Sequence, residues 1–247
     1  MFKILKNRLD QGYRTTGYPN ETIKLSSRYR GRPQINRHAP AEVIAECAAA
    51  CPQDAIDISK KLIDMGRCVF CGTCERISKG EFISFTQDFE ISVSEKEHLL
   101  TDGGLPALAD HSKQHFKKLF GRSLQLRQVS AGGCNACEAD LNVLATPFFD
   151  LARFGINFVA SPRHADGIVV TGPVSKNMKT ALLKTFEATA SPKVVIAVGS
   201  CALTGGPFRG SPEIAEGLDS ILPVDLFIPG CPPHPLTNLH ALLTFFK

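Results

Sequence analysis

The stretch PKVVIAVGSC, residues 192–201, decides the fold of this chain. Its five consecutive apolar residues, 194–198, match a strand that is buried on both faces. Such strands are typical of parallel sheets, because crossover helices cover both faces of the sheet. A glycine, a serine and a cysteine follow at once, so the stretch predicts a thiol at the carboxyl end of a buried strand.

The same kind of short, β-branched run recurs on both sides of this stretch, separated by helical segments. The predicted strands are 124–129, 156–160, 167–171, 194–199 and 224–229. A helix is predicted over 177–189, and a basic helix over 107–120 precedes the first strand. Short apolar strands that alternate with helices indicate an α/β domain with a mainly parallel sheet.

Four cysteines, named here the second quartet, follow three of these strands. They are Cys134, Cys137, Cys201 and Cys231. The carboxyl ends of parallel strands form the crevice where ligands bind, so we expect the four thiols to gather at one edge of the sheet. Glycines flank each position and permit close approach of the backbone to a bulky cofactor. The spacing leaves a zinc ion and a [4Fe–4S] cluster about equally open.

A first quartet of cysteines lies nearer the N-terminus. Cys68-Val-Phe-Cys71-Gly-Thr-Cys74 is a C-x2-C-x2-C run, and Cys51 is followed by proline. Bacterial two-cluster ferredoxins use C-x2-C-x2-C-x3-C-P twice, and the last cysteine of each run binds the other cluster. Cys51, Cys68, Cys71 and Cys74 therefore predict one complete [4Fe–4S] cluster. Structural zinc is disfavoured, because it uses two C-x2-C pairs about 15–20 residues apart.

The other cluster of such a ferredoxin has lost its ligands in this chain. Ala41, Ile44 and Ser78 stand where three of its cysteines are expected, and Cys47 alone is left. One thiolate cannot hold a four-iron cluster, so Cys47 is predicted to be a small buried thiol without a metal.

Composition excludes several classes of protein. The formal charge of +4 over 247 residues is too small, and too evenly spread, for nucleic-acid binding. No run approaches the roughly 18 apolar residues of a membrane span, and the first residues do not resemble a signal peptide. We therefore expect a cytoplasmic protein, in which the nine cysteines stay reduced rather than form disulfides.

Three parts are predicted along the chain: an N-terminal arm at 1–37, a ferredoxin-like α+β domain at 38–104 and an α/β domain at 105–247. Residues 102–106, DGGLP, form a linker between the two domains. Apolar and basic residues alternate irregularly over residues 2–9, which predicts a short amphipathic turn. We expect a partner to order this arm.

Four segments of the α/β domain resemble the small subunit of energy-converting [NiFe] hydrogenases of the formate hydrogenlyase type. They are GRSLQLRQVSAGGCNACEADL (121–141), FGINFVASPRHADGIVVTGPVS (154–175), PKVVIAVGSCALTGGPF (192–208) and VDLFIPGCPPHP (224–235). The same family includes the complex I subunit that carries the terminal cluster before quinone. The resemblance covers residues 119–243. It implies a flavodoxin-like domain that holds one [4Fe–4S] cluster on the second quartet, beside a catalytic large subunit.

Details of the motifs favour the hydrogenase branch. Complex I relatives characteristically have adjacent cysteines where this chain has Cys134 and Cys137, and glutamine where it has His164. Arg163 lies near the cluster in this family, where a positive charge favours the reduced state; a surface ion pair for Arg163 and a hydrogen-bonded loop histidine for His164 stay open. Glu138 is a candidate for a proton route, although a carboxylate at a helix start is also stabilised by the helix dipole.

The resemblance implies an iron–sulfur subunit of an oxidoreductase, with no complete active site of its own. Its two [4Fe–4S] clusters relay electrons between a donor or acceptor protein and a [NiFe] centre in the large subunit. The complex includes membrane-embedded subunits, and this chain lies peripherally on the cytoplasmic side of the cell membrane. The N-terminal part resembles the ferredoxin-like subunit of such complexes, truncated and fused in front.

Two alternatives remain. A related ion-translocating complex without hydrogenase activity can use the same relay to reduce a quinone or a sulfur compound. A stand-alone zinc-binding or regulatory protein is the other.

Overall fold

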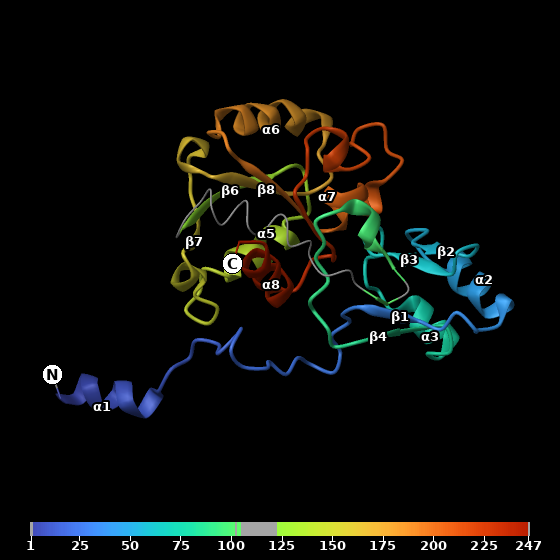
Figure 1. Cartoon of the computed structure of the whole chain (residues 1–247), viewed down its shortest axis with the longest axis horizontal. Helices are drawn as coiled ribbons and strands as arrows, with labels where there is room; N and C mark the ends of the chain where they lie inside the picture. Colours follow the sequence, from blue (N-terminus) through green and yellow to red (C-terminus); the bar gives the residue numbers. More distant parts are fainter. Residues whose placement is uncertain (1, 102, 105–122, 247) are drawn as a thin grey trace.

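The computed structural model describes residues 2–101, 103–104 and 123–246. Figure 1 shows a larger domain built on one sheet, a smaller domain beside it that carries β1 to β4, and an N-terminal helix that projects away from both.

Five strands form the sheet of the larger domain. They are β6 (Leu124–Ser130), β7 (Ile156–Phe158), β8 (Gly167–Thr171), β9 (Val194–Val198) and β10 (Leu226–Ile228). Every pairing is parallel, in the order β10-β9-β8-β6-β7. Counted from β7, the strands come second, first, third, fourth and fifth in the chain, which is the order of flavodoxin-like sheets. The predicted parallel α/β fold is confirmed.

Helices cover both faces of this sheet (Figure 1). The helical elements are α5 (Ala136–Val143), α6 (Lys176–Ala188), α7 (Ser200–Thr204) and α8 (Pro235–Phe246), with 3-10 turns η2 (Leu151–Phe154), η3 (Pro162–His164), η4 (Gly206–Phe208) and η5 (Leu218–Ser220). Along β9, Val194 and Ile196 pack into the core that holds α5 and α8, while Val195 and Ala197 pack into the core that holds Leu182 of α6. Successive side chains of a strand point to opposite faces of the sheet, so the continuous apolar run of β9 contributes to the hydrophobic cores on both faces.

The smaller domain is a compact α+β unit. Its elements are β1 (Pro33–Ile35), α2 (Ala41–Ala49), β2 (Ile56–Asp57), β3 (Leu62–Asp64), α3 (Thr73–Ser78), β4 (Ile83–Phe85), η1 (Lys96–Leu99) and β5 (Leu100–Thr101). β1 pairs with β4, and β2, β3 and β5 form a second sheet; all these pairings are antiparallel. Ile44, Phe82 and Ile83 are buried in its own core.

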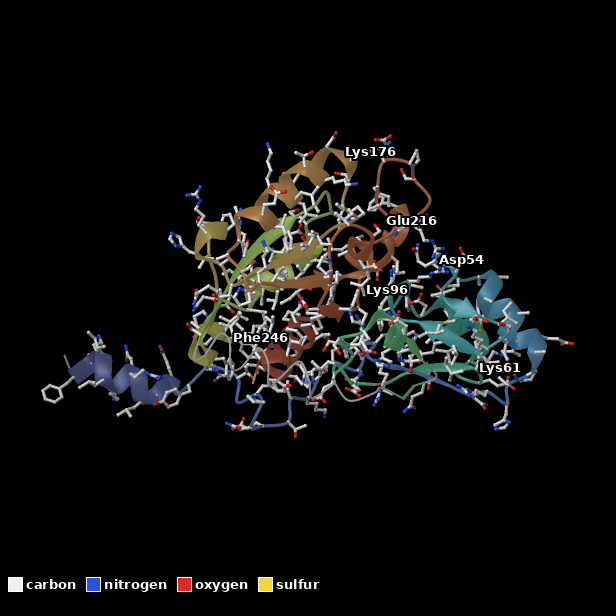
Figure 2. The ribbon with its side chains drawn as sticks, turned by 45° about the horizontal axis from the view of Figure 1, so that its top comes forward. Asp54, Lys61, Lys96, Lys176, Glu216 and Phe246 are labelled. Atoms are coloured by element: carbon white, nitrogen blue, oxygen red, sulfur yellow. The ribbon has the colours of Figure 1, made fainter. Side chains whose placement is uncertain are left out.

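Residues of both domains pack into one hydrophobic core, and further contacts join the domains at their interface. Met65, Val93 and Leu99 belong to the same buried cluster as the α6 face of the large sheet. Val93 exchanges two backbone hydrogen bonds with Phe227 of β10, of 2.8 and 3.0 Å. Ion pairs from Asp54 to Arg209 (2.8 Å) and from Lys96 to Asp219 (2.6 Å) span the border, where Figure 2 labels Asp54 and Lys96. Extensive burial of this kind holds the two domains in one fixed arrangement.

Most of the N-terminal arm lies on the larger domain of its own chain. The backbone N–H of Thr16 donates to the carbonyl of Phe148 (2.8 Å), and Arg153 donates to the carbonyls of Thr16 and Tyr18. This part of the arm therefore has contacts within its own chain, and the expected role of a partner in ordering the arm stays a prediction. The predicted amphipathic turn is a longer helix, α1 (Phe2–Gln11), in which every residue is exposed (Figure 2).

The remaining predicted elements agree with the structure to within two residues at most ends. Strand 156–160 stops at Phe158, and strand 224–229 is shortened to Leu226–Ile228. The predicted basic helix at 107–120 and most of the predicted linker lie outside the described residues. Within the described ranges, no helix combines the length and the apolar character that crossing a membrane requires.

Candidate metal centres

The first quartet lies around one cavity of the smaller domain. Cys51 follows α2, Cys68 and Cys71 lie on the loop between β3 and α3, and Cys74 is in the first turn of α3. All four cysteines line the cavity, together with apolar side chains such as Ile63. The compact C-x2-C-x2-C run folds around this cavity, and Cys51 approaches it from the end of α2.

Backbone groups in this loop are directed at the sulfur atoms. The N–H of Phe70 donates to Sγ of Cys68 (3.4 Å), and the N–H of Ala55 donates to Sγ of Cys51 (3.3 Å). Phe70 holds a positive φ of 53°, which an L-residue adopts at a cost of about 1–3 kcal/mol. Such strain and such donors are typical of a loop shaped to hold a metal, because hydrogen bonds to thiolates tune the metal centre.

Burial opposes ionisation of these thiols. It raises the pKa of Cys68 well above its ordinary value and raises the pKa of Cys74 to about 11. Repulsion from neighbouring cysteines raises both pKa values further: from Cys74, Cys51 and Cys71 for Cys68, and from Cys47, Cys71 and Cys51 for Cys74. A bound metal supplies the positive charge that deprotonates such thiols.

The second quartet gathers at the carboxyl edge of the large sheet, as predicted. Cys134 lies in the loop after β6, Cys137 in the first turn of α5, Cys201 in α7 after β9, and Cys231 in the loop after β10. Burial raises the pKa of Cys137, and the charges of the other three cysteines raise it further. For Cys201, burial and then repulsion from Cys231 and Cys134 raise the pKa to about 11.

Two glycines permit this convergence. A Cβ added to Gly199 would lie 2.6 Å from Sγ of Cys137, and a Cβ added to Gly206 would lie 2.9 Å from Sγ of Cys201. Real Cβ atoms do not approach sulfur so closely, and both residues also have a positive φ. The predicted role of glycine as a means of close approach is therefore visible at these two positions.

Neither quartet is arranged around one ion. In the described parts of the chain, no group of three or more His, Cys, Asp or Glu side chains is close enough to hold a single metal ion. Cysteine thiolates are the usual ligands of [4Fe–4S] clusters, so the donor type of each quartet fits such a cluster. The kind of metal centre that each quartet holds stays a prediction.

Glu138 is buried next to Cys137, with 6% of its surface exposed. Its Oε1 accepts a hydrogen bond of 2.7 Å from the hydroxyl of Thr171, which is itself fully buried. A buried carboxylate with a hydroxyl partner is consistent with either a proton route or a structural role.

Arg163 and His164 lie in η3, on the connection that follows β7. Both side chains are exposed, at the same edge of the sheet as the second quartet because β7 is parallel to β6. Their predicted influence on a cluster stays a prediction.

Cys47 is fully buried, as predicted. That it binds no metal stays a prediction. Its Sγ donates to the carbonyl oxygen of Cys74 at 3.4 Å, and burial raises its pKa.

Three residues near the quartets gave no signal in the sequence. Arg30 packs against Gly72 and donates to the carbonyl of Phe70 (3.4 Å), so it brings a positive charge to the first quartet. It also lines a hollow that Phe70 and Cys231 share, between the two quartets. Ser200 and Thr204 of α7 donate to carbonyls of the smaller domain. No local sequence pattern predicts these contacts, which join residues 40, 132 and 138 positions apart.

A family model described as the NADH ubiquinone oxidoreductase 20 Kd subunit matches residues 134–245. That range contains the whole second quartet and none of the first.

Three relatives extend the match. The probable membrane-bound hydrogenase subunit mbhJ of Pyrococcus furiosus is 44% identical over 126 residues, which are 51% of this chain and 75% of that protein. Formate hydrogenlyase subunit 7 of Escherichia coli is 39% identical over 56% of this chain and 55% of its own length. In a Roseiflexus species, a subunit of the NADH-quinone oxidoreductase is 44% identical over 52% of this chain and 48% of its own length.

Proposed function

This chain belongs to the family of the 20 Kd subunit of NADH ubiquinone oxidoreductase and related hydrogenase small subunits, and we propose that it relays electrons through two [4Fe–4S] clusters within a membrane-associated [NiFe] hydrogenase complex. As in its relatives, the chain is one subunit of an oxidoreductase. The clusters and their number are the proposal.

The observation that carries the proposal is the convergence of eight cysteines as two separate quartets in adjoining domains. Cys51, Cys68, Cys71 and Cys74 line one cavity, while Cys134, Cys137, Cys201 and Cys231 follow the carboxyl ends of strands in one parallel sheet. The hollow lined by Phe70 and Cys231 lies where the two ligand loops adjoin. Two redox groups in neighbouring loops make a relay.

Each part of the chain has a defined task in this relay. The eight thiolates would bind the clusters. The amides of Ala55 and Phe70 donate hydrogen bonds to sulfurs of the first quartet, and the apolar side chains that line its cavity exclude water. When bound, a [4Fe–4S] cluster accepts and donates one electron at a time. Arg163 and Arg30 place positive charge at the second and first quartets, which favours the reduced state. Glu138 holds or passes a proton beside Cys137.

The partners follow from the relatives. The names membrane-bound hydrogenase and formate hydrogenlyase support a catalytic large subunit that holds the [NiFe] centre, together with membrane-embedded subunits. Phe2, Ile4 and Leu9 of α1 are at least 74% exposed, beside basic residues, and support peripheral attachment of this chain to the rest of the complex on the cytoplasmic side of the membrane. An upstream protein donates or accepts electrons at the smaller domain.

A redox titration of the purified full-length chain, followed by electron paramagnetic resonance, tests the relay. We expect two one-electron transitions, each with the spectrum of a [4Fe–4S] cluster. A chain that holds zinc and shows no reducible signal would contradict the proposal and support the stand-alone zinc protein.

The second candidate is the same relay in an ion-translocating complex that reduces a quinone or a sulfur compound. The similarity to part of an NADH-quinone oxidoreductase supports it. The two candidates differ in the partner, so nickel analysis of the purified complex separates them: nickel supports the hydrogenase, and a complex with iron but no nickel supports the alternative.

A further inference from the structure

The two quartets are connected by one buried side chain, Ser200 in the first turn of α7. Its hydroxyl donates to the carbonyl oxygen of Cys68 at 2.9 Å, and this contact joins residues 132 positions apart. Cys68 belongs to the first quartet. The next residue after Ser200 is Cys201, a member of the second quartet.

The same serine also holds the loop that carries Cys231. Its backbone N–H donates to the carbonyl of Gly230 at 2.8 Å, and its hydroxyl lies 3.2 Å from that oxygen. Three ligand-bearing loops therefore meet at Ser200. With 1% of its surface exposed, the serine has no water to replace these partners.

We infer that Ser200 is a positioning residue that fixes the separation of the two cysteine quartets by tying the carbonyl of Cys68 to the loops of Cys201 and Cys231. The inference rests on the proposed two-cluster function. Transfer of an electron between two centres weakens steeply as they move apart, so a small displacement of the Cys68 loop matters. The hydrogen bond of Ser200 also completes a path through bonds from Cys68 to Cys201, in which every other step is a covalent bond.

Thr204, one turn further along α7, supplies a matched comparison. Its hydroxyl donates to the carbonyl of Gly66 at 3.1 Å, and this contact is also buried and also joins the two domains. Gly66 is not a ligand. Loss of the Thr204 hydroxyl therefore removes a buried contact between the domains, and one of 3.2 Å to the backbone carbonyl of Ser200, but it leaves the Ser200 hydroxyl bound to the Cys68 carbonyl.

The test compares S200A with T204V in the full-length chain, loaded with iron and sulfide and then reduced. Pulsed electron paramagnetic resonance measures the magnetic coupling between the clusters, and flash reduction measures the rate at which they exchange an electron. We expect S200A to keep its iron, to show a weaker and more heterogeneous coupling and to exchange electrons several-fold more slowly. T204V should match the wild type in both.

Other outcomes are equally decisive. If S200A matches the wild type, or if T204V loses as much coupling as S200A, Ser200 has no special role and the inference is wrong. If S200A fails to load iron, S200T decides: coupling like that of the wild type supports a positioning hydroxyl, and altered coupling overturns it. A wild-type chain without two interacting clusters refutes the proposed function itself, and with it this inference.

Discussion

The two quartets are assembled in different ways. In the first, Cys68, Cys71 and Cys74 lie on the loop before α3 and in its first turn, so local geometry brings these three together. In the second, the four cysteines come from three loops spread over residues 134–231, and the parallel sheet brings them together.

This difference indicates which substitutions should disrupt each quartet. The first quartet depends on the conformation of one strained loop, in which Phe70 and Gly72 both have a positive φ. The second depends on the register in which the buried strands β6, β8, β9 and β10 pair. It also depends on close contacts in the loops that follow β6, β9 and β10. Substitutions should therefore damage the two quartets independently.

Cys201→Ser should have the largest effect. The hydroxyl of serine is a poor substitute for a thiolate, so the second cluster should be lost, and with it about four iron atoms per chain. Because the proposed relay passes electrons to the catalytic partner through the second quartet, turnover of the assembled complex should disappear. Iron analysis and activity measurement on the same preparation check this. Full turnover in this variant would exclude a relay through the second quartet.

Cys71→Ser should remove the other cluster and spare the second. Cys71 is exposed, so its replacement disturbs little besides the bond to iron. We expect the loss of about four iron atoms, while the spectrum of the remaining cluster stays as it is in the wild type. Equal loss from both sites would show that the quartets do not form independent centres.

Gly199→Ala should damage the second site without removing any ligand. The new Cβ would meet Sγ of Cys137 at 2.6 Å, in a backbone conformation with a φ of 85°. Gly210→Ala is the matched control, because Gly210 has the same φ of 85° and nothing within 4 Å of the added Cβ.

Both alanines should cost about 1–3 kcal/mol of unfolding free energy from the positive φ alone, and Gly199→Ala toward the upper end, because φ 85° with ψ 153° is a conformation that essentially only glycine adopts. Iron in the second site should fall in Gly199→Ala and stay unchanged in Gly210→Ala; iron content and denaturant unfolding measure the two effects. Equal iron content in the two variants would mean that close approach at Gly199 is unimportant.

Cys47→Ala should have the smallest effect. The side chain is fully buried and makes one weak hydrogen bond to the carbonyl of Cys74. We expect a loss of about 1 kcal/mol in unfolding free energy, from the small cavity, and an unchanged iron content. A loss of four iron atoms would make Cys47 a ligand and would require a new assignment of the first quartet.

The sequence was sufficient for features that depend on local pattern. The apolar runs predicted all five strands of the large sheet, and the thiols of the second quartet lie at the strand ends where the pattern placed them. The compact C-x2-C-x2-C spacing likewise identified the loop of the first quartet, and Cys51 lies on the same cavity.

Features that depend on distant contacts could not be predicted. Met65 and Leu99 look like core residues of the smaller domain, yet they pack into the core of the larger one. The bond from Ser200 to Cys68 gives no signal, because a serine beside a ligand is equally compatible with a solvent contact. Nor did residues 2–9 carry enough periodicity to distinguish a turn from the helix α1.

The most direct test of two separate quartets is to count iron and acid-labile sulfide in the full-length chain, purified without oxygen. We expect about eight of each per chain, because every cubane contains four irons and four sulfides. About four of each would leave one quartet without a cluster, and zinc in place of iron would contradict the account as a whole.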